Sequence, residues 1–262
     1  MDPLLTAYDA QVRASFARRI PAGWTAEHDG PLVRCLTSRG GFAMLTPDVV
    51  ELSTSDLAAL VRRTVAFYAE RHRTFEWKTF DHDQANLPPL LLGSGFVAED
   101  HEALVMGPVA ALAAEPVLPT GLSIRQVSER ADLERVAAME SEVWGTDWSW
   151  LADDLAGRIA DPLEPALVYV DEDVDRMVSA AWLVPLAGTE VAGLWGGSTL
   201  AEYRGRGIYR ALVAHRALEA QRRGCSLLQV DASDDSRPIL ERLGLRTVGG
   251  TTPYRWTPEE DR

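Results

Sequence analysis

Cysteine is scarce in this sequence. Only two of the 262 residues are cysteines, Cys35 and Cys225, and they stand far apart and outside any metal-ligand spacing. A disulfide framework or a structural metal site is therefore not expected. The scarcity favours a reducing compartment, and we expect a cytoplasmic protein.

Long hydrophobic runs are also lacking. No apolar stretch approaches the roughly 18 residues that a transmembrane helix needs. The first residues, Met1–Leu5, lack the basic region and the apolar core of a signal peptide. We expect neither export nor a membrane partner.

Basic residues are outnumbered. Lys and Arg total 26 against 39 Asp and Glu, so the net charge is −13, of which −9 falls in residues 111–262. A nucleic-acid partner needs a basic face and is not expected. Cationic small molecules would be attracted instead, although acidity can also serve solubility alone.

The composition is that of a globular protein, with 46% hydrophobic and 25% charged residues. The segment 108–119 holds three prolines, many alanines and one charge, which is typical of a linker. We predict a domain at 1–107, a linker at 108–120 and a second domain at 121–262.

The second domain shows a regular succession of patterns. We predict strands at 122–127, 166–170, 176–184, 190–200, 226–231 and 246–256, and helices at 128–144, 148–159, 208–223 and 236–243. A turn is expected at Asp171–Asp173. This order indicates a mixed α/β (α+β) domain.

The first domain resembles a degenerate copy of the second. Its helical stripe (57–68), strand (75–80) and helix (87–93) recur in the same order, and Gly95-Phe96 precedes Gly244-Leu245 by 149 positions. We therefore hypothesise an internal duplication. At the position of the glycine loop described next, this half has Ser55-Asp56, with neither glycine nor arginine.

A short glycine loop follows the strand predicted at 190–200 and precedes a helix. Two glycines allow close backbone approach, and the amides of the helix start form an anion site suited to a diphosphate. Two arginines add positive charge; the alternative is a plain strand-to-helix turn. The residues of the loop are Arg204, Gly205, Arg206, Gly207, Ile208 and Tyr209.

This loop resembles the Arg/Gln-x-x-Gly-x-Gly/Ala motif of the GNAT superfamily of N-acyltransferases. Arg204 and Gly207 match, whereas Tyr209 replaces a small residue and would crowd the phosphates or place a hydroxyl near them. The resemblance covers about residues 121–256 and implies tandem GNAT-like domains, each a splayed mixed sheet flanked by helices. It also implies acetyl-CoA or another acyl-CoA as the donor, with no metal.

The resemblance further implies an acyl-CoA cleft beside the strand that precedes the loop. Ser198, Thr199 and Leu200 would line this cleft, and an N–H of Thr199 or Leu200 would stabilise the oxyanion. The glycine pair Gly196-Gly197 fits a β-bulge, or it relieves crowding against a tryptophan.

A general base must take the proton of the attacking amine. Glu140 lies on an otherwise apolar helical stripe, where burial would raise its pKa and suit it to this role, unless it reaches water at the stripe's edge. Glu142 and Glu190 are weaker candidates.

The usual general acid of the family is missing. Leu240 stands where many relatives have a tyrosine, and Ser233 replaces a frequent asparagine. Ser233 and Ser236 are assigned to the cofactor site, and Ser236, Tyr254 or solvent would protonate the thiolate.

Several tryptophans are candidates for the acceptor site. We assign Trp144, Trp148, Trp182 and Trp195 to substrate binding, because aromatic walls suit a cation, although they also suit a core. Asp81-His82-Asp83 is interpreted as a polar turn.

The sequence thus predicts an N-acetyltransferase acting on a small-molecule amine, with a homodimer left open. The alternatives are a non-catalytic acyl-CoA-binding or regulatory module and a protein N-acetyltransferase.

Overall fold

A computed structural model describes residues 2–21, 23–47, 51–173 and 176–258. Contacts divide the chain into two compact units, each built from a mixed sheet and helices. The units are made of Met1–Val105, Asp231–Arg237 and Thr247–Arg262 for the first, and Met106–Val230 and Pro238–Arg246 for the second.

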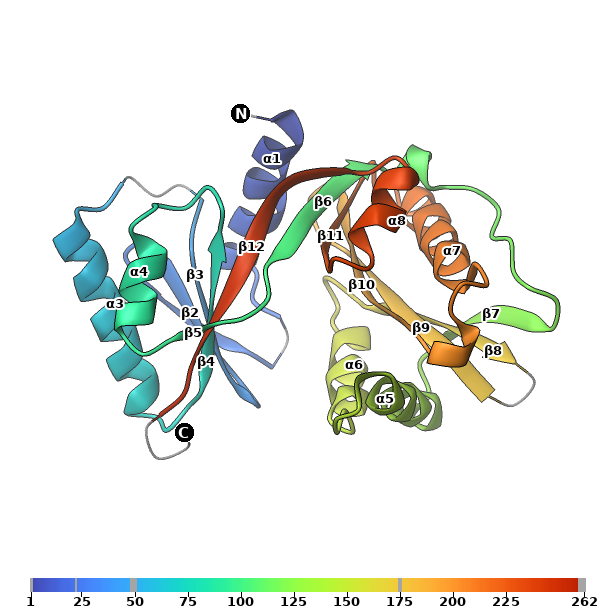
Figure 1. Ribbon diagram of the computed structural model, residues 1–262, viewed down its shortest axis with the longest axis horizontal. Coiled ribbons are helices and arrows are strands. Elements are labelled where there is room, and N and C mark those ends of the chain that lie inside the picture. The colour runs from blue at the N-terminus through green and yellow to red at the C-terminus, as the bar shows by residue number, and fades with distance from the viewer. Residues whose placement is uncertain (1, 22, 48–50, 174–175, 259–262) are drawn as a thin grey trace. The chain divides into compact units, whose positions relative to one another are not determined.

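The first unit begins with helix and continues with a three-stranded meander (Figure 1). Its helical elements are α1 (Pro3–Tyr8), the π-helical η1 (Asp9–Arg13), α2 (Ala14–Arg18), α3 (Thr54–Ala69) and α4 (Leu87–Gly93). Its strands are β1 (Thr25–Asp29), β2 (Leu32–Thr37), β3 (Gly40–Leu45), β4 (Phe75–Phe80), β5 (Val97–Ala98), β6 (Glu102–Pro108) and β12 (Arg246–Trp256).

The sheet of the first unit runs in the order β1-β2-β3-β4-β12. β3 and β4 pair in parallel, and β12 pairs antiparallel with β4 over Thr251–Trp256. The apolar stripe of α3 packs on this sheet, where Tyr68 stacks on Phe75 with ring centroids 3.9 Å apart. The stripe expected at residues 57–68 is therefore confirmed as a core face.

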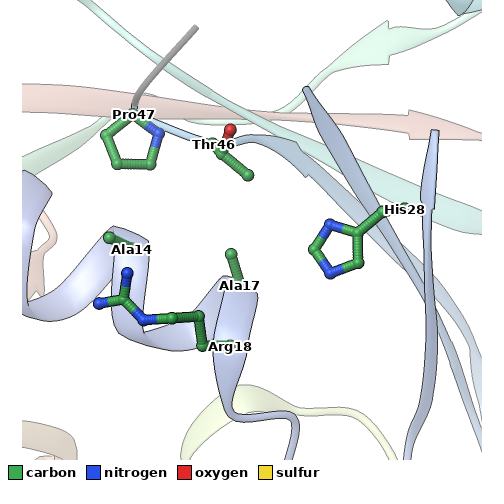
Figure 2. A pocket seen from close by; sticks show the side chains of 6 residues that line it. All are labelled: Ala14, Ala17, Arg18, His28, Thr46 and Pro47. Atoms are coloured by element: carbon green, nitrogen blue, oxygen red, sulfur yellow. The ribbon is translucent and has the colours of Figure 1, made fainter. Parts of the chain in front are cut away.

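A surface pocket of about 360 Å³ lies in the first unit (Figure 2). Ala14, Ala17 and Arg18 reach it from α2, His28 from β1, and Thr46 with Pro47 from the segment after β3.

The second unit contains the predicted succession of elements. Its strands are β7 (Leu122–Val127), β8 (Leu167–Asp173), β9 (Arg176–Pro185), β10 (Val191–Thr199) and β11 (Leu227–Ala232). Its helices are α5 (Arg130–Trp144), α6 (Leu151–Ile159), α7 (Ile208–Arg222), α8 (Arg237–Arg242) and the 3₁₀ turns η2 (Val109–Ala111) and η3 (Ala201–Tyr203).

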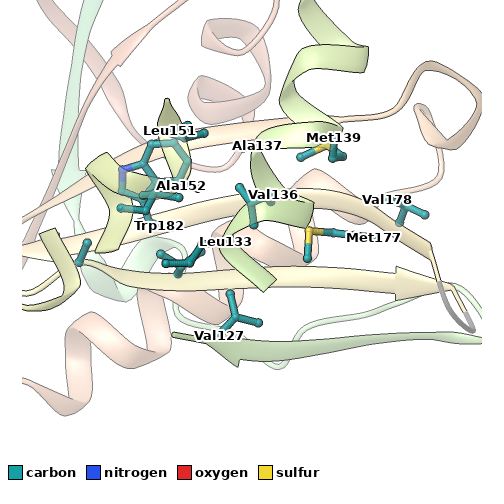
Figure 3. Packing of buried hydrophobic residues seen from close by; sticks show 14 of the residues in the cluster. Val127, Leu133, Val136, Ala137, Met139, Leu151, Ala152, Met177, Val178 and Trp182 are labelled. Carbon is teal, nitrogen blue, oxygen red and sulfur yellow. The ribbon is translucent and has the colours of Figure 1, made fainter. Parts of the chain in front are cut away.

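The strands of the second unit run in the order β11-β10-β9-β8-β7; β10 and β11 pair in parallel, and the other described pairs are antiparallel. Alternate residues of β9, Val178, Ala180 and Trp182, pack against α5 and α6 (Figure 3). Since successive strand residues face opposite sides, Ser179 and Ala181 face the other side, which α7 covers.

One local expectation was wrong. The turn predicted at Asp171–Asp173 is strand, because these residues continue the pairing of β8 with both β7 and β9. An acidic segment is typical of a turn, but here the backbone hydrogen bonds to β7 and β9 on either side keep it in strand conformation.

The segment predicted as a linker is partly structured. β6 extends to Pro108, η2 follows, and the side chains of Val109 and Leu112 are buried. The N–H of Val109 donates to the carbonyl of Ser226 at 2.9 Å. Residues 113–121 contain no helix or strand.

The two units repeat a local motif that the sequence suggested. Gly95 and Gly244 follow α4 and α8 with φ of 86° and 105°, the left-handed conformation that glycine adopts at helix ends. The next residues, Phe96 and Leu245, donate to the fifth carbonyl before them at 3.2 and 3.1 Å, and both are buried. This correspondence supports a duplication.

Contacts group the last strand differently from the predicted domains. Thr247–Trp256 belongs to the first unit, where it pairs with β4, whereas the prediction placed residues up to 262 in the second domain. Sequence patterns locate a strand but not the strand that it pairs with. The domain boundaries at 107 and 121 therefore stay a prediction.

Candidate active site

The glycine loop forms the start of α7. Gly205 and Gly207 have φ of 72° and 87°, and an added Cβ at either would meet no atom within 4 Å, so backbone conformation requires glycine there. Gly207 is the N-cap, no side chain caps the helix, and its first turn holds no acidic residue. The first amides and the positive dipole end thus keep their capacity to bind an anion.

Arginines flank this helix start. Arg204 is exposed and donates from Nε to the carbonyl of Thr199 at 3.0 Å, which ties the loop to the end of β10. The guanidinium of Arg206 lies 5.0 Å from the ring centroid of Tyr203. Both are placed on the loop that would receive a diphosphate.

The corresponding helix of the first unit is capped differently. Ser53 accepts from the N–H of Asp56 at 3.2 Å, and its hydroxyl donates to the Asp56 carboxylate at 2.6 Å. A side-chain cap and a carboxylate therefore occupy the positive end of α3. This observation supports the expectation that the first unit cannot hold a diphosphate in the same way.

The strands on either side of α7 diverge. β10 and β11 pair only over Val191–Gly193 and Leu227–Gln229, although β10 extends to Thr199 and β11 to Ala232. Their remaining backbone groups are not paired with one another. In the first unit, by contrast, β3 and β4 pair as far as Met44, next to the end of β3.

A β-bulge lies in β10 where the strands diverge, as predicted. The register with β9 shifts between Gly196 and Ser198, and both glycines have positive φ. A Cβ at Gly196 would lie 2.5 Å from the Trp182 ring, and one at Gly197 would lie 2.8 Å from the Tyr209 ring. The Tyr209 ring therefore packs against the bulge from the α7 side.

The N–H groups at the end of β10 do not all face the same way. Leu200 donates its N–H to the carbonyl of Val178 at 2.9 Å, which rules it out as the oxyanion donor predicted from the sequence. Because alternate residues of an antiparallel strand bond the same neighbour, the N–H of Thr199 points away from β9, toward the edge where β11 diverges.

Hydroxyl groups brace the same segment. Ser179 donates from Oγ to the carbonyl of Ser198 at 2.6 Å. Since a hydroxyl has one hydrogen, its second contact, 2.9 Å to Thr199 Oγ1, must be donated by Thr199. Ser179 and Thr199 are both buried. Sequence reasoning missed Ser179, because an isolated serine within a strand carries no signal.

Glu140 is buried against the bulge from the α5 side. Its side chain is only 2% exposed, and Oε2 accepts from Ser198 Oγ at 2.6 Å and from Trp144 Nε1 at 2.9 Å. Among the described residues, none donates to Oε1. Burial raises the pKa of this carboxyl, although the bonds from Ser198 and Trp144 act in the opposite direction.

The weaker base candidates lie at the surface. Glu142 is exposed and pairs with Arg176 at 2.8 Å, and the Glu190 carboxylate accepts from the Ser226 hydroxyl.

The tryptophans divide into two groups. Trp144, Trp148 and Trp150 stack in sequence, with centroids 6.2 and 5.1 Å apart, and Trp144 is 58% exposed. Trp182 is buried under the bulge in the core of Figure 3, and its cross-strand partner Trp195 is 40% exposed. Only Trp144 and Trp195 thus present substantial surface.

Ser236 and Tyr254, which were considered as general acid, both group by contacts with the first unit. Ser233 is exposed and Ser236 is half-buried, and their hydroxyl oxygens lie 3.2 Å apart at hydrogen-bond distance. Leu240 is completely buried. Tyr254 is buried in the core of the first unit, which does not favour it as an acid for a thiolate.

A buried arginine was not foreseen. Arg216 on α7 is 1% exposed and donates to the carbonyls of Leu212, Trp182 and Trp195 at 3.1, 3.3 and 3.1 Å. Burial lowers its pKa to about 10. The guanidinium thus holds β9 and β10 together directly before the bulge.

The segment Asp81–Asp83 is a turn whose side chains have protein partners. Asp83 bonds Arg13 at 2.5 Å, His82 contacts Asp9 at 3.1 Å, and Asp81 contacts His101 at 3.2 Å. Within the described part of the chain, no group of three or more His, Cys, Asp or Glu side chains is arranged to hold a metal ion. Nor does any described helix have both the length and the apolar character that would let it cross a bilayer.

Comparisons with known proteins agree with this geometry. Residues 130–245 match the acetyltransferase (GNAT) family. No curated protein matches the sequence.

Several solved structures share the fold over most of the chain. A GCN5-related N-acetyltransferase from Kribbella flavida has a TM-score of 0.70 at 18% identity and covers 93% of this chain and 95% of its own. A GCN5-related N-acetyltransferase from Sphaerobacter thermophilus has a TM-score of 0.62 at 16% identity, and the match covers 87% of this chain and 76% of that one. A tandem GNAT protein from the clavulanic acid biosynthesis pathway has a TM-score of 0.61 at 12% identity, and the match covers 93% of this chain and 86% of that one. The chain therefore has the fold of tandem GNAT proteins, and its residues 130–245 match the GNAT acetyltransferase family.

Proposed function

We propose that the second unit is an N-acetyltransferase that transfers an acetyl group from acetyl-CoA to a primary amine by direct attack on the thioester. The family match supports acyl transfer in general. The observation that carries the finer proposal is the uncapped, acid-free start of α7 beside two diverging strands.

Each part of acyl-CoA has a proposed partner. The diphosphate binds the amides of Gly205 to Tyr209, with Arg204 and Arg206 supplying charge. The pantetheine arm takes the strand edge at 198–200, where β11 has left β10. Acyl-CoA is a co-substrate here, and no metal is needed for the step.

The chemistry follows from two groups of the second unit. The N–H of Thr199 points to the cleft edge and stabilises the oxyanion that forms at the thioester carbonyl. Glu140 takes the proton of the amine, because a carboxylate with a raised pKa is a better base near neutral pH. Ser236 remains a proposed general acid, with solvent as its substitute.

The acceptor is proposed to be a small cationic amine. Net charge of −13 attracts cations, and Trp144 presents an exposed indole beside Glu140. A protein N-terminus or lysine is the alternative acceptor. We place the reaction in the cytoplasm, which agrees with two free cysteines, Cys35 and Cys225. A homodimer stays open.

A non-catalytic acyl-CoA-binding module is favoured by one observation. The position of the family's tyrosine holds Leu240, which is buried and cannot donate a proton. In that case acetyl-CoA binds but no acyl transfer occurs.

A thiol-release assay with acetyl-CoA and a panel of amines decides between the two. Polyamines, aminoglycosides, aralkylamines and a lysine-containing peptide represent the acceptor classes, and mass spectrometry should find a product heavier by one acetyl group. Release that depends on an amine supports the proposal. Binding of acetyl-CoA without release from any amine would overturn it and leave the binding module.

A further inference from the structure

We propose that Ser198 is a catalytic residue of the acyl transfer, whose hydroxyl relays the proton of the acceptor amine to Glu140. The inference rests on the proposed function and adds a group that sequence reasoning had assigned only to cofactor binding. Two observations carry it: the enclosure of Glu140 and the position of Ser198 on the cleft strand.

An amine cannot readily reach Glu140 itself. Glu140 is 2% exposed, and its Oε2 already accepts from both Ser198 and Trp144. The other oxygen is fully buried. A base enclosed in this way needs an intermediary that touches both the carboxylate and the substrate.

Ser198 contacts the carboxylate, lies on the strand beside the proposed cleft and, at 9% exposed, is less enclosed than Glu140. Its Oγ lies 2.6 Å from Glu140 Oε2, and its neighbour Thr199 directs its N–H to the edge where β11 diverges. Adjacent Cα atoms are 3.8 Å apart, so the proposed binding position of the thioester carbonyl, at the N–H of Thr199, belongs to the residue next to Ser198. Gly197 packs against Tyr209 on the α7 side, whereas Ser198 faces Glu140 on the α5 side.

The backbone of Ser198 is held independently of its hydroxyl. Its carbonyl accepts from Ser179, and the ladder with β9 resumes at Ser198 opposite Ala180. The hydroxyl is therefore not required to keep the strand in place, and its single hydrogen is directed at the carboxylate.

The proton transfer balances as follows. The ammonium gives one proton to Ser198 Oγ while the hydroxyl proton of Ser198 passes to Glu140, leaving a neutral amine and a neutral carboxyl. The amine nitrogen forms a bond to the thioester carbon, the C–S bond breaks, and its electron pair goes to sulfur. The second nitrogen proton goes to the thiolate, and Glu140 later returns its proton to solvent through Ser198.

The test compares Ser198→Ala with Ser198→Thr, which keeps the hydroxyl, using an amine that the wild-type protein acetylates. General-base catalysis contributes about 10²–10⁴-fold, so we expect Ser198→Ala to lower kcat at pH 7 by about 100-fold or more. Its rate should then rise with pH toward the pKa of the free amine, near 10.4, instead of levelling above the pKa of Glu140. Ser198→Thr should recover most of the loss.

The matched control is Ser226→Ala, which removes the other serine–glutamate hydrogen bond of this unit, at an exposed site. It should keep the wild-type rate and profile. Affinity for CoA, measured by calorimetry, should be the same in all three variants. In the double variant with Glu140→Gln, the two losses should not add, because the groups act in series.

The outcomes separate the relay from the proposed function. If the wild-type protein acetylates no amine, the proposed function fails and the relay with it. If it does, and Ser198→Ala keeps the kcat and pH profile of Ser226→Ala, only the relay is refuted. Additive losses in the double variant would likewise refute it. Should Ser198→Ala fail to fold, the profiles of Ser198→Thr and Glu140→Gln decide: a wild-type profile in Glu140→Gln overturns the relay.

Discussion

A carboxylate at the start of α7 should weaken CoA binding strongly while leaving the fold intact. Gly207 is the N-cap of this helix, and a Cβ added there meets no atom within 4 Å. The substitution Gly207→Asp would give this helix the acidic end that Asp56 gives α3 in the first unit.

The substitution should change the free energy of unfolding little and the free energy of CoA binding much. A non-glycine residue at φ of 87° costs about 1–2 kcal/mol, while a carboxylate at a helix start returns about 0.3–1 kcal/mol. The midpoint of unfolding should therefore fall by only a few degrees. A unit charge about 5 Å from a phosphate, at an effective dielectric constant of 20, repels it by roughly 3 kcal/mol. CoA affinity should fall at least about 100-fold.

Calorimetry with CoA and thermal unfolding of the same samples measure both effects. Gly224→Asp is the matched control, because Gly224 follows the other end of α7, has φ of 81° and also has no atom within 4 Å of an added Cβ. Gly224→Asp should lower the stability of the fold without weakening the binding of CoA. The reasoning is refuted if Gly207→Asp binds CoA within threefold of the wild type, or if Gly224→Asp loses as much affinity.

Three further outcomes are expected. A base acts only when deprotonated, so kcat/KM should rise with pH through the raised pKa of Glu140, and Glu140→Gln should remove this limb; a persisting limb would assign it to another group. Trp144→Phe deletes a hydrogen bond that lowers this pKa, so the limb should move to higher pH; an unmoved limb would contradict the assignment. Gly197→Ala places a Cβ 2.8 Å from the Tyr209 ring at positive φ and should cost about 1–3 kcal/mol of unfolding free energy, measured with urea; full stability would mean that the bulge relaxes freely.

The elements of the second unit could be predicted because local signals agree there. Period-two and helical patterns alternate between β7 and β11, and glycines punctuate the loop and the end of α8. The place of Glu140 on an apolar stripe suggested a buried base, but the stripe alone could not decide between burial and an edge position that reaches water. Its bonds to Ser198 and Trp144 decide it, and one of them spans 58 residues.

The remaining site depends on long-range pairing that patterns do not specify. Leu200 was a candidate oxyanion donor until its pairing with Val178 fixed the direction of its N–H. Tyr254 was a candidate acid, but β12 pairs with β4 and buries it in the first unit. In the sequence Arg216 looks like any exposed helix arginine, and only the packing of α7 on β9 and β10 supplies the carbonyls of Trp182 and Trp195 that make its burial tolerable.

The proposed function requires that the start of α7 binds a nucleotide diphosphate. The most direct test titrates the intact protein with CoA and with pantetheine, which lacks the diphosphate and the nucleotide. We predict measurable heat and 1:1 binding for CoA, and affinity weaker by at least about 100-fold for pantetheine. Absence of CoA binding, or equal affinity for the two compounds, would contradict the account.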